Sequence, residues 1–377
     1  MVIHTISNVP VFNGRKVNAA VNVTFRASPG DIISIEAGAR DFASIDTVID
    51  GRGCTLLPAF IDANVDTAAT HTDLPIFASY GIGTVFDMSS TKADIQAMRA
   101  ESIAEVGLPT YLASGPIATS QATDGAQIHP DRETGVVQVP AGAETWVTSL
   151  LDGPTKSDYI KVLVDLPGID GPTLIALVHA AHRHGKLAVA HSFQKVGYSR
   201  ALQAGFDVIT LVPIDGFIET EVAEGLAARN IACIPTLCMA RAMVPLLLRE
   251  ASDGVEDVSF DYALANVKKL YDAGVRICAG TEANQISHVP IPIGESLHEE
   301  MELLVRAGLS NLDALRAATI IPTIVFGMGD RGEISLGRRA DMVLVEGDPL
   351  QDITATRKIR KVWIGGVEID GWDAVPV

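Results

Sequence analysis

Short apolar runs alternate with helical segments between residues 58 and 329, and this alternation constrains the fold more than any other feature of the chain. The runs lie at residues 84–87, 159–164, 187–190, 208–211, 232–235 and 276–279. Strands that alternate with helices over such a length pack as parallel strands joined by crossover helices. The sequence therefore predicts an α/β fold, with a (β/α)8 TIM barrel as the main expectation and a doubly wound open sheet as the alternative.

The two ends of the chain have a different pattern. Short alternating runs separated by glycine and proline turn signals occupy the start of the chain, and strand-like runs return at 340–345 and 361–364. Both ends therefore have the pattern of a small β-domain. We expect residues 1–57 and 330–377 to form one small β-sandwich, and residues 58–329 to form the barrel.

The composition excludes several classes of partner. A formal net charge of -17 at pH 7 repels nucleic acid and anionic bilayers. The chain contains no apolar stretch of the roughly 20 residues that span a bilayer, and its first residues do not resemble a secretory signal. We therefore expect a cytoplasmic protein that acts on a small-molecule substrate, without nucleic acid or membrane partners. A homo-oligomer is an open alternative.

Several segments resemble, in the same order, sequences of the amidohydrolase superfamily, in particular its imidazolonepropionase- and prolidase-like branch. These segments are residues 53–63, 80–88, 279–283, 294–298, 307–310, 314–319 and 330–345. The first of them, Gly53-Cys-Thr-Leu-Leu-Pro-Ala-Phe-Ile-Asp-Ala63, is similar to the sequence that leads into the first barrel strand of that superfamily. Because the segments extend over nearly the whole chain, the resemblance implies the superfamily's barrel fold and a hydrolase-type enzyme.

The resemblance also implies where a metal site would lie. In that superfamily, metal is held by a His-x-His pair after strand one, a carboxylated lysine on strand four, histidines after strands five and six, and an aspartate after strand eight. The corresponding positions of this chain are Asn64, Asp66, Lys161, His191, Leu211 and Glu282. Only Lys161 and His191 keep the expected residue type. An amide and a leucine do not replace an imidazole as ligands, so the resemblance implies a degenerate metal site. Asn64 and Leu211 then become candidate substrate-binding residues.

Three functions are open for the four catalytic candidates, which are Asp66, Lys161, His191 and Glu282. In the main hypothesis they hold one zinc, manganese or iron ion, which activates water to hydrolyse an amide, ester or lactone bond. In the second, no metal binds, and Lys161, His191 and the carboxylates serve as acid and base groups of a lyase, isomerase or cyclase. In the third, the chain is a pseudoenzyme or binding protein, and the charged groups only fill the former site.

Further candidates for substrate binding lie in the loops expected after the strands. Gln127 and His129 belong to a long polar segment after the third strand, a length typical of loops that cover a barrel mouth. His288 follows the eighth strand, and Arg241 follows a run that is expected to be the seventh strand and ends at Met239. An arginine suits a substrate carboxylate because its guanidinium pairs with two oxygens. A structural or solvent-exposed role is the common alternative for each of these residues.

Overall fold

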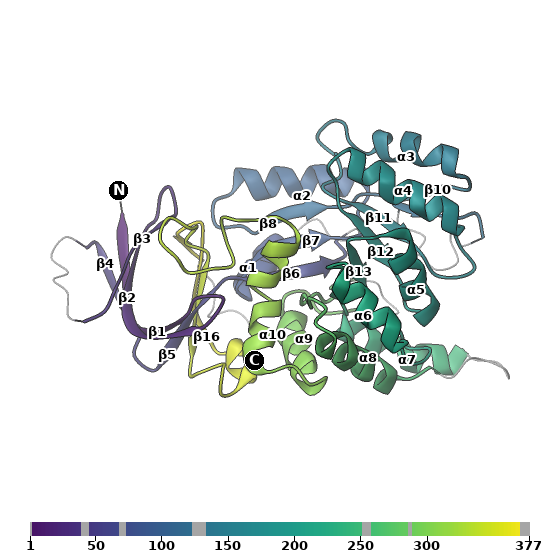
Figure 1. Cartoon of the computed structure of the whole chain (residues 1–377). Coiled ribbons are helices and arrows are strands. Elements are labelled where there is room, and N and C mark those ends of the chain that lie inside the picture. Colours follow the sequence, from purple (N-terminus) through teal and green to yellow (C-terminus); the bar gives the residue numbers. More distant parts are fainter. Residues whose placement is uncertain are drawn as a thin grey trace.

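The structure is a computed structural model that describes residues 2–38, 45–67, 73–122, 133–250, 258–285 and 289–369. A sheet built from both ends of the chain lies beside a larger body of strands and helices (Figure 1). Within the described ranges, no helix is long and apolar enough to cross a membrane.

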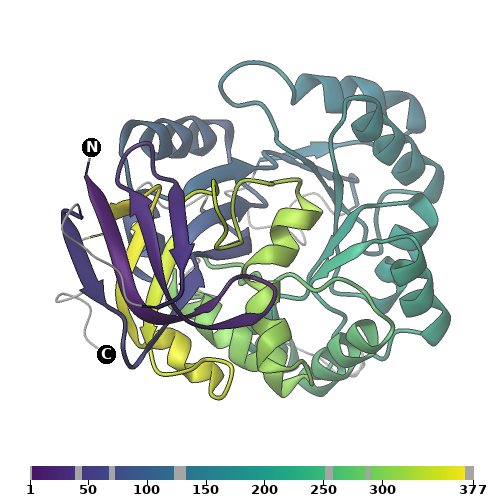
Figure 2. The ribbon, with the colours of Figure 1, turned by 60° about the vertical axis from the view of Figure 1, so that its left-hand side comes forward.

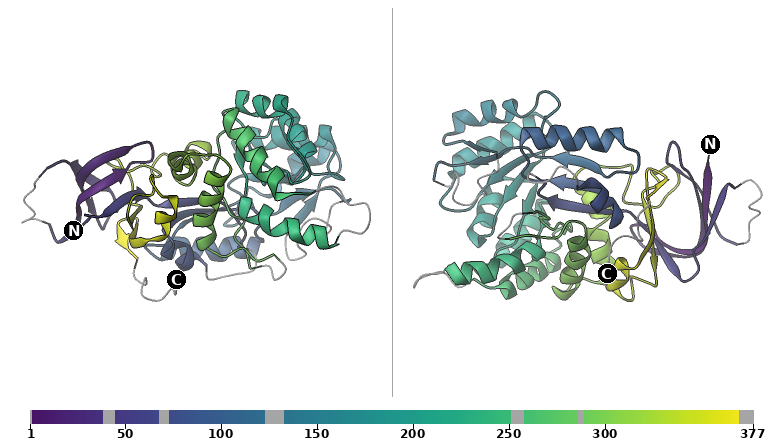
Figure 3. Two further views of the ribbon diagram at one scale, coloured as in Figure 1. Left: turned by 90° about the horizontal axis from the view of Figure 1, so that it is seen from below. Right: turned by 180° about the vertical axis from the view of Figure 1, so that it is seen from behind.

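Eight strands from the two ends of the chain form one mixed sheet, which we call the terminal sheet. Its strands are β1 (Ile3–Phe12), β2 (Val17–Arg26), β3 (Ile32–Glu36), β4 (Thr47–Asp50), β5 (Cys54–Pro58), β15 (Met342–Glu346), β16 (Ile359–Ile364) and β17 (Val367–Glu368). The hydrogen-bonded order is β17-β16-β15-β5-β1-β2-β3, with β4 paired to β1. The fully buried rings of Phe25 and Trp363 meet edge to face within its core, 5.6 Å apart. Figure 3 shows this sheet at one end of the molecule. A two-layered sandwich with the domain limits given above stays a prediction.

The remaining chain, which we call the body, alternates strands with helices. The strands of the body are β6 (Phe60–Val65), β7 (Ile82–Asp87), β8 (Thr110–Ala113), β9 (Ile117–Thr119), β10 (Thr134–Val136), β11 (Ile160–Leu163), β12 (Ala188–His191), β13 (Val208–Thr210) and β14 (Ala232–Ile234). Its helices are α1 (Leu74–Ser79), α2 (Lys92–Ala104), α3 (Ala143–Ser149), α4 (Gly171–Arg183), α5 (Lys195–Ala204), α6 (Thr220–Ala228), α7 (Leu237–Glu250), α8 (Phe260–Asp272), α9 (Glu295–Arg306), α10 (Asn311–Ala317) and α11 (Ile320–Val325). Figure 2 shows helices on the outside of the strands. The predicted α/β fold is therefore confirmed.

The strands of the body pair in parallel and form two sheets. One has the order β6-β7-β8, and the other has the order β10-β9-β11-β12-β13-β14. On one side the sheets meet where the Asp158 amide donates to the Ala113 carbonyl at 2.8 Å. On the other side, residues 277–283 bridge the gap, because Ile277 pairs with β14 and Ala283 pairs with β6. The carboxyl ends of strands from both sheets consequently lie along one continuous edge.

Capping side chains determine where several helices begin. The Asp170 carboxylate accepts a hydrogen bond from the Thr173 amide at 2.8 Å at the start of α4. Thr91, Ser259 and Ser310 cap α2, α8 and α10 in the same way. Such a cap satisfies an amide that the helix leaves unpaired and stabilises it by about 1 kcal/mol. These helices therefore start at defined positions after the strands and loops that precede them.

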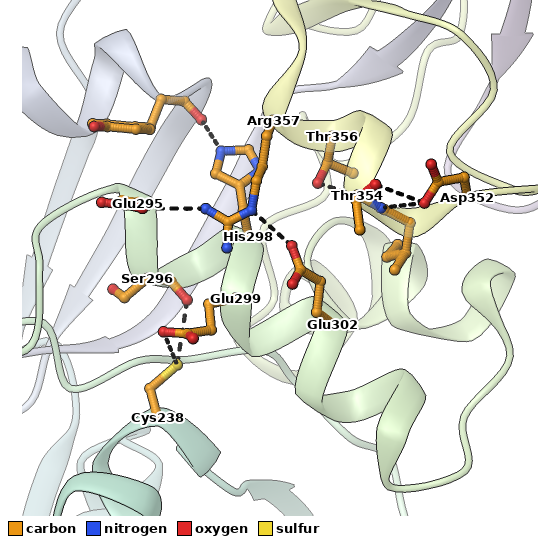
Figure 4. A network of polar contacts seen from close by, with 12 residues as sticks. Cys238, Glu295, Ser296, His298, Glu299, Glu302, Asp352, Thr354, Thr356 and Arg357 are labelled. Carbon is orange, nitrogen blue, oxygen red and sulfur yellow. Dashed lines mark hydrogen bonds and ion pairs between the residues drawn. The ribbon is translucent and has the colours of Figure 1, made fainter. Parts of the chain in front are cut away.

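A polar network connects the 3-10 helix η2 (Ile353–Arg357), which lies between β15 and β16, to helix α9 (Figure 4). The Arg357 guanidinium donates to Glu302 at 2.7 Å and to Glu295 at 3.4 Å. On the same helix, His298 Nε2 donates to the Tyr80 carbonyl at 3.1 Å. Burial lowers the pKa of His298 to about 3, so this imidazole is a neutral packing group near pH 7.

Candidate active site

Three of the four catalytic candidates lie at or beside the carboxyl ends of strands, and the fourth, Lys161, is the second residue of its strand. Asp66 directly follows β6, Lys161 lies in β11, His191 ends β12, and Glu282 belongs to the bridging segment 277–283. Asp66 and Lys161 are buried, with 4% and 1% of their surfaces exposed, whereas His191 and Glu282 are half-buried. Two of the candidates are therefore enclosed by the protein, and the other two are accessible to water or a small molecule.

Backbone hydrogen bonds hold Asp66 and Glu282 on neighbouring segments. The amide of Glu282 donates to the Asn64 carbonyl at 2.6 Å, and the amide of Asp66 donates to the Ala283 carbonyl at 2.9 Å. Gly280 lets the segment 277–283 lie close to β6, because a Cβ at this position would lie only 2.7 Å from the Asn64 amide nitrogen. The residues at the two former His-x-His positions and at the former aspartate position thus lie beside each other.

Lys161 reaches across β12 to the next strand. Its ammonium donates a hydrogen bond to the Thr210 hydroxyl, which itself donates to the Ala190 carbonyl at 3.2 Å. His191 pairs in register with both Leu163 and Thr210. The lysine and the histidine therefore belong to three adjacent strands, and Thr210 fixes the position of the lysine nitrogen.

Three residues other than glycine adopt left-handed backbone conformations close to this edge. They are Leu211 after β13, Thr236 after β14, and Glu282, with φ angles of 69°, 47° and 57°. Such a conformation costs about 1 to 2 kcal/mol per residue, and strain of this kind is frequent at functional sites. The surrounding hydrogen bonds hold it in place, for example the bond from the Leu211 amide to the Ile234 carbonyl at 2.8 Å.

The residues present do not fit the metal centre of the superfamily. Leu211 is fully buried and offers no donor atom, and Asn64 offers only an amide where an imidazole is required. Across the ranges that the structure describes, no group of three or more His, Cys, Asp or Glu side chains is placed to hold a metal ion. The donor chemistry therefore gives no support for a binuclear site.

Two fully buried carboxyl groups that the sequence did not indicate lie close to this edge. Asp62 accepts hydrogen bonds from the Thr281 hydroxyl at 2.7 Å and from the Thr281 amide at 3.0 Å. Glu300 accepts from the amides of Leu237 and Cys238, both at 2.9 Å. Burial raises the pKa of each carboxyl group to about 7, although these hydrogen bonds oppose the shift. Asp62 thereby ties β6 to the segment that carries Glu282.

A third buried carboxyl group ends β7. Asp87 accepts hydrogen bonds from the Tyr111 hydroxyl at 3.0 Å and from the amides of Ser89 at 3.0 Å and Thr67 at 3.1 Å. Burial raises the pKa of Asp87. Since Thr67 directly follows Asp66, this network fixes the chain next to a catalytic candidate. Its position at a strand end is the one signal that could have identified Asp87 from the sequence.

The structure corrects the expectation for the seventh strand. β14 ends at Ile234, and α7 begins at Leu237, so Met239 and Arg241 lie in a helix rather than after a strand. The Arg241 guanidinium pairs with Glu299 at 2.7 Å, and Met239 is buried among apolar side chains. A role for Asn64, Leu211, Met239 or Arg241 in substrate binding stays a prediction. Gln127, His129 and His288 lie outside the described residues.

Comparison with known proteins identifies the family. A model of the amidohydrolase family matches residues 55–369, which is most of the chain. This chain belongs to the amidohydrolase family. The predicted membership is therefore confirmed, and with it the expectation of an amidohydrolase-type enzyme at the level of the family.

Individual relatives match this amidohydrolase at low sequence identity or over only part of its length. The ochratoxinase of Aspergillus niger is 24% identical over 308 residues, which cover 76% of this chain but only 59% of the ochratoxinase. An imidazolonepropionase of Deinococcus deserti is 31% identical over 106 residues, covering 27% of this chain and 26% of that protein. This chain thus spans about six tenths of the length of the ochratoxinase that it matches.

Solved structures superimpose on nearly the whole chain. A Xaa-Pro dipeptidase with bound methionine superimposes with a TM-score of 0.81 at 20% identity, covering 98% of this chain and all of that one. A molinate hydrolase superimposes with a TM-score of 0.79 at 18% identity, covering 100% of this chain and 96% of that one. At such identities the likeness establishes the common fold.

Proposed function

We propose that this amidohydrolase hydrolyses an amide, ester or lactone bond in a small organic substrate by a mechanism that uses no bound metal ion. The observation that carries this proposal is that Lys161 and His191 keep their residue types on the adjacent strands β11 and β12, while the buried Leu211 stands where the superfamily has a ligand. Charged and titratable groups occupy four of the six ligand positions that the resemblance implies, and an apolar side chain stands at a fifth.

The architecture supports this location of the site. We infer that β6, β7, β8, β11, β12, β13, β14 and residues 277–283 are the eight strands of a (β/α)8 barrel, because backbone pairing joins the two sheets of the body on both sides. The terminal sheet would then be the small second domain, formed by residues 1–57 and 330–377. Enzymes built on such barrels keep their chemistry at the carboxyl ends of the strands.

Burial suggests how the four residues divide the work. His191 is half-buried, and histidine is the commonest general base of enzymes, so it suits the base that takes a proton from the attacking water. Lys161 is enclosed and held by Thr210, so its side-chain nitrogen is suited to donate a hydrogen bond to the carbonyl oxygen that becomes negative during the attack. The same imidazole would then return this proton to the leaving group, and the half-buried Glu282 would stabilise the charged ring. Asp66 would orient the lysine.

An open cleft lies among loops that follow strands of the body, and its lining includes none of the four catalytic candidates. It has a volume of about 450 Å³ and is lined in part by Ser120 and Gln121, which follow β9, and by Ile169 and Asp170, which follow β11. This volume lies within the range of small-molecule sites, which is roughly 300 to 1,000 Å³. A cleft of this size is consistent with a small organic substrate. It would hold the part of the substrate that lies away from the hydrolysed bond.

The proposal is tested first by metal content. Protein purified without chelator is analysed for zinc, manganese and iron per chain, together with Lys161→Ala. We expect far less than one equivalent in both proteins, because the donor set does not fit. One equivalent in the wild type that is lost in Lys161→Ala would contradict a metal-free mechanism and restore the mononuclear hydrolase.

Hydrolysis itself is tested by turnover of N-acyl amino acids, esters and lactones in water labelled with oxygen-18. We expect the label in the product, and a loss of about 10²- to 10⁴-fold in kcat/KM for His191→Ala, the size typical of a general base. His184→Ala is the matched control, because His184 pairs with Glu144 on the surface. An unlabelled product would indicate the lyase or isomerase instead, and full activity of His191→Ala would show that the site assignment is wrong.

A further inference from the structure

A second cleft, lined by three arginines, lies where the terminal sheet meets the body. Its volume is about 300 Å³, and it is lined by Arg15 from the turn between β1 and β2, by residues of α11, and by Arg331 and Arg338 from the segment that precedes β15. Among the described residues that line it, Glu333 is the one acidic side chain. An excess of positive charge is unusual in a chain whose net charge is -17.

Of the three arginines, Arg338 has the positive charge that is least neutralised by nearby carboxylates. Its backbone is fixed, because its amide donates to the Ser335 carbonyl at 3.1 Å and its carbonyl accepts from the Ile32 amide at 2.9 Å. A Cβ added to Gly329 would lie 3.9 Å from Arg338 Nη1, so the guanidinium lies over the glycine of the facing turn. Within the described part of the chain, the side chain of Arg338 has no ion-pair partner.

The other two arginines are held on either side of the cleft. Arg15 is 59% exposed, and its Nε lies 3.7 Å from Glu333, which is a long ion pair. The carbonyl of Arg15 accepts hydrogen bonds from Arg316, so that its position is fixed. Arg331 is buried and paired with Asp330 at 2.9 Å, and therefore contributes a partly compensated charge.

This cleft is separate from the candidate active site. The Arg331 guanidinium donates to the hydroxyls of Thr84 at 2.9 Å and Thr110 at 2.6 Å, which lie toward the amino ends of β7 and β8. Asp66, His191 and Glu282 lie at or beside the carboxyl ends of this set of parallel strands, and none of the four catalytic candidates lines the cleft. A molecule in the cleft would contact the terminal sheet through Arg15 and the body through Arg331.

We propose that this cleft binds a small anion with two or more negative charges, such as a phosphorylated or polycarboxylate compound. Arginine forms paired hydrogen bonds with phosphate and carboxylate oxygens, and its weak hydration makes it suitable for such contacts. The apolar side chains of Ile320, Ile324 and Met328 would pack against a short organic part of the ligand. Because such a ligand contacts both parts of the protein, it stabilises the folded chain.

The test is thermal unfolding of the full chain with inorganic pyrophosphate or with citrate, each compared with sodium chloride at equal ionic strength. We expect a rise in Tm that saturates with at least one of the two anions, because ligands that bind only the folded state stabilise it by mass action. For Arg338→Gln, we expect the half-saturating concentration to rise at least tenfold. Arg52→Gln is the matched control, since this exposed arginine pairs with Asp50 elsewhere on the terminal sheet.

The outcomes separate the possible ligands and the alternatives. A response to pyrophosphate alone indicates a phosphorylated ligand, and a response to citrate alone indicates a polycarboxylate. The proposal is overturned if neither anion gives a saturable shift beyond that of sodium chloride. It is also overturned if Arg338→Gln responds as Arg52→Gln does, because the effect would then come from general screening of charge.

Discussion

The strand ends beside Asp66 and His191 contrast with an apolar layer that packs elsewhere along the strands of the body. That layer includes Phe86, Tyr159, Val189 and Val208, which are buried together, and Phe326 from the end of α11 packs against it. The rings of Phe86 and Phe326 stack 4.1 Å apart. At the strand ends, by contrast, the structure tolerates left-handed residues and buried charges. The comparison suggests that stability resides mainly in the layer, so that the strand ends were able to change while the fold was kept.

The largest effect on stability is expected for Phe86→Ala. Removal of a fully buried ring from this layer leaves a cavity and costs about 3 to 5 kcal/mol of the free energy of unfolding. Urea denaturation followed by circular dichroism measures the loss. Phe217→Ala is the control, because Phe217 is more than half exposed and should change stability by less than about 1 kcal/mol. Equal losses for the two variants would contradict the view that the apolar layer provides most of the stability.

An intermediate effect, dependent on pH, is expected for Asp62→Asn. Burial raises the pKa of Asp62 from 3.8 to about 7, so the folded protein holds a proton that the unfolded chain releases between these values. The stability from this group is therefore complete below about pH 4 and is lost as the pH rises through 7. Asparagine carries no proton of this kind, so the fall should become shallower by up to about 1.4 kcal/mol per pH unit.

Denaturation of both proteins at several pH values from 5 to 8 provides the measurement. Glu300, whose pKa is also raised to about 7, keeps part of the slope in the variant. Asp272→Asn is a suitable control because this carboxylate is exposed and paired with Lys268. Identical pH profiles for the wild type and Asp62→Asn would show that Asp62 is ionised in the folded protein.

The smallest effect is expected for His191→Ala. This imidazole is half-buried, and its ring lies 6.0 Å from that of Phe193, so its removal should change the free energy of unfolding by less than about 1 kcal/mol. The same urea measurement applies. A loss as large as that of Phe86→Ala would mean that the strand ends stabilise the fold as strongly as the apolar layer does.

The sequence predicted the body and the candidate positions better than it predicted the local conformations. The alternation of strands and helices and the family-like segments identified β6, β11 and β12, and with them Asp66, Lys161 and His191. The left-handed conformation of Leu211 was not predictable, because only glycine and asparagine signal such a backbone. The run 235–239 was assigned wrongly, since a short apolar run fits a strand and the first turn of a helix equally well.

The buried carboxyl groups could not be predicted from the sequence for a different reason. Asp62 and Glu300 accept backbone amides from segments that are more than 60 positions away in the chain. Such partners are set by the tertiary fold rather than by local sequence. The pairing of β5 with β15 was likewise anticipated only as a β unit made from both ends, and its register came from the structure.

That pairing has a consequence for how the protein is synthesised. β5 lies between β1 and β15, and the Thr55 hydroxyl donates to the Gly347 carbonyl across 292 positions of the chain. At about 5 to 20 residues per second, β5 waits on the order of 15 to 60 s for its second neighbour to leave the ribosome. During that time it is an open edge that can pair with other chains. Protection of this one strand during translation would therefore govern the yield of folded protein.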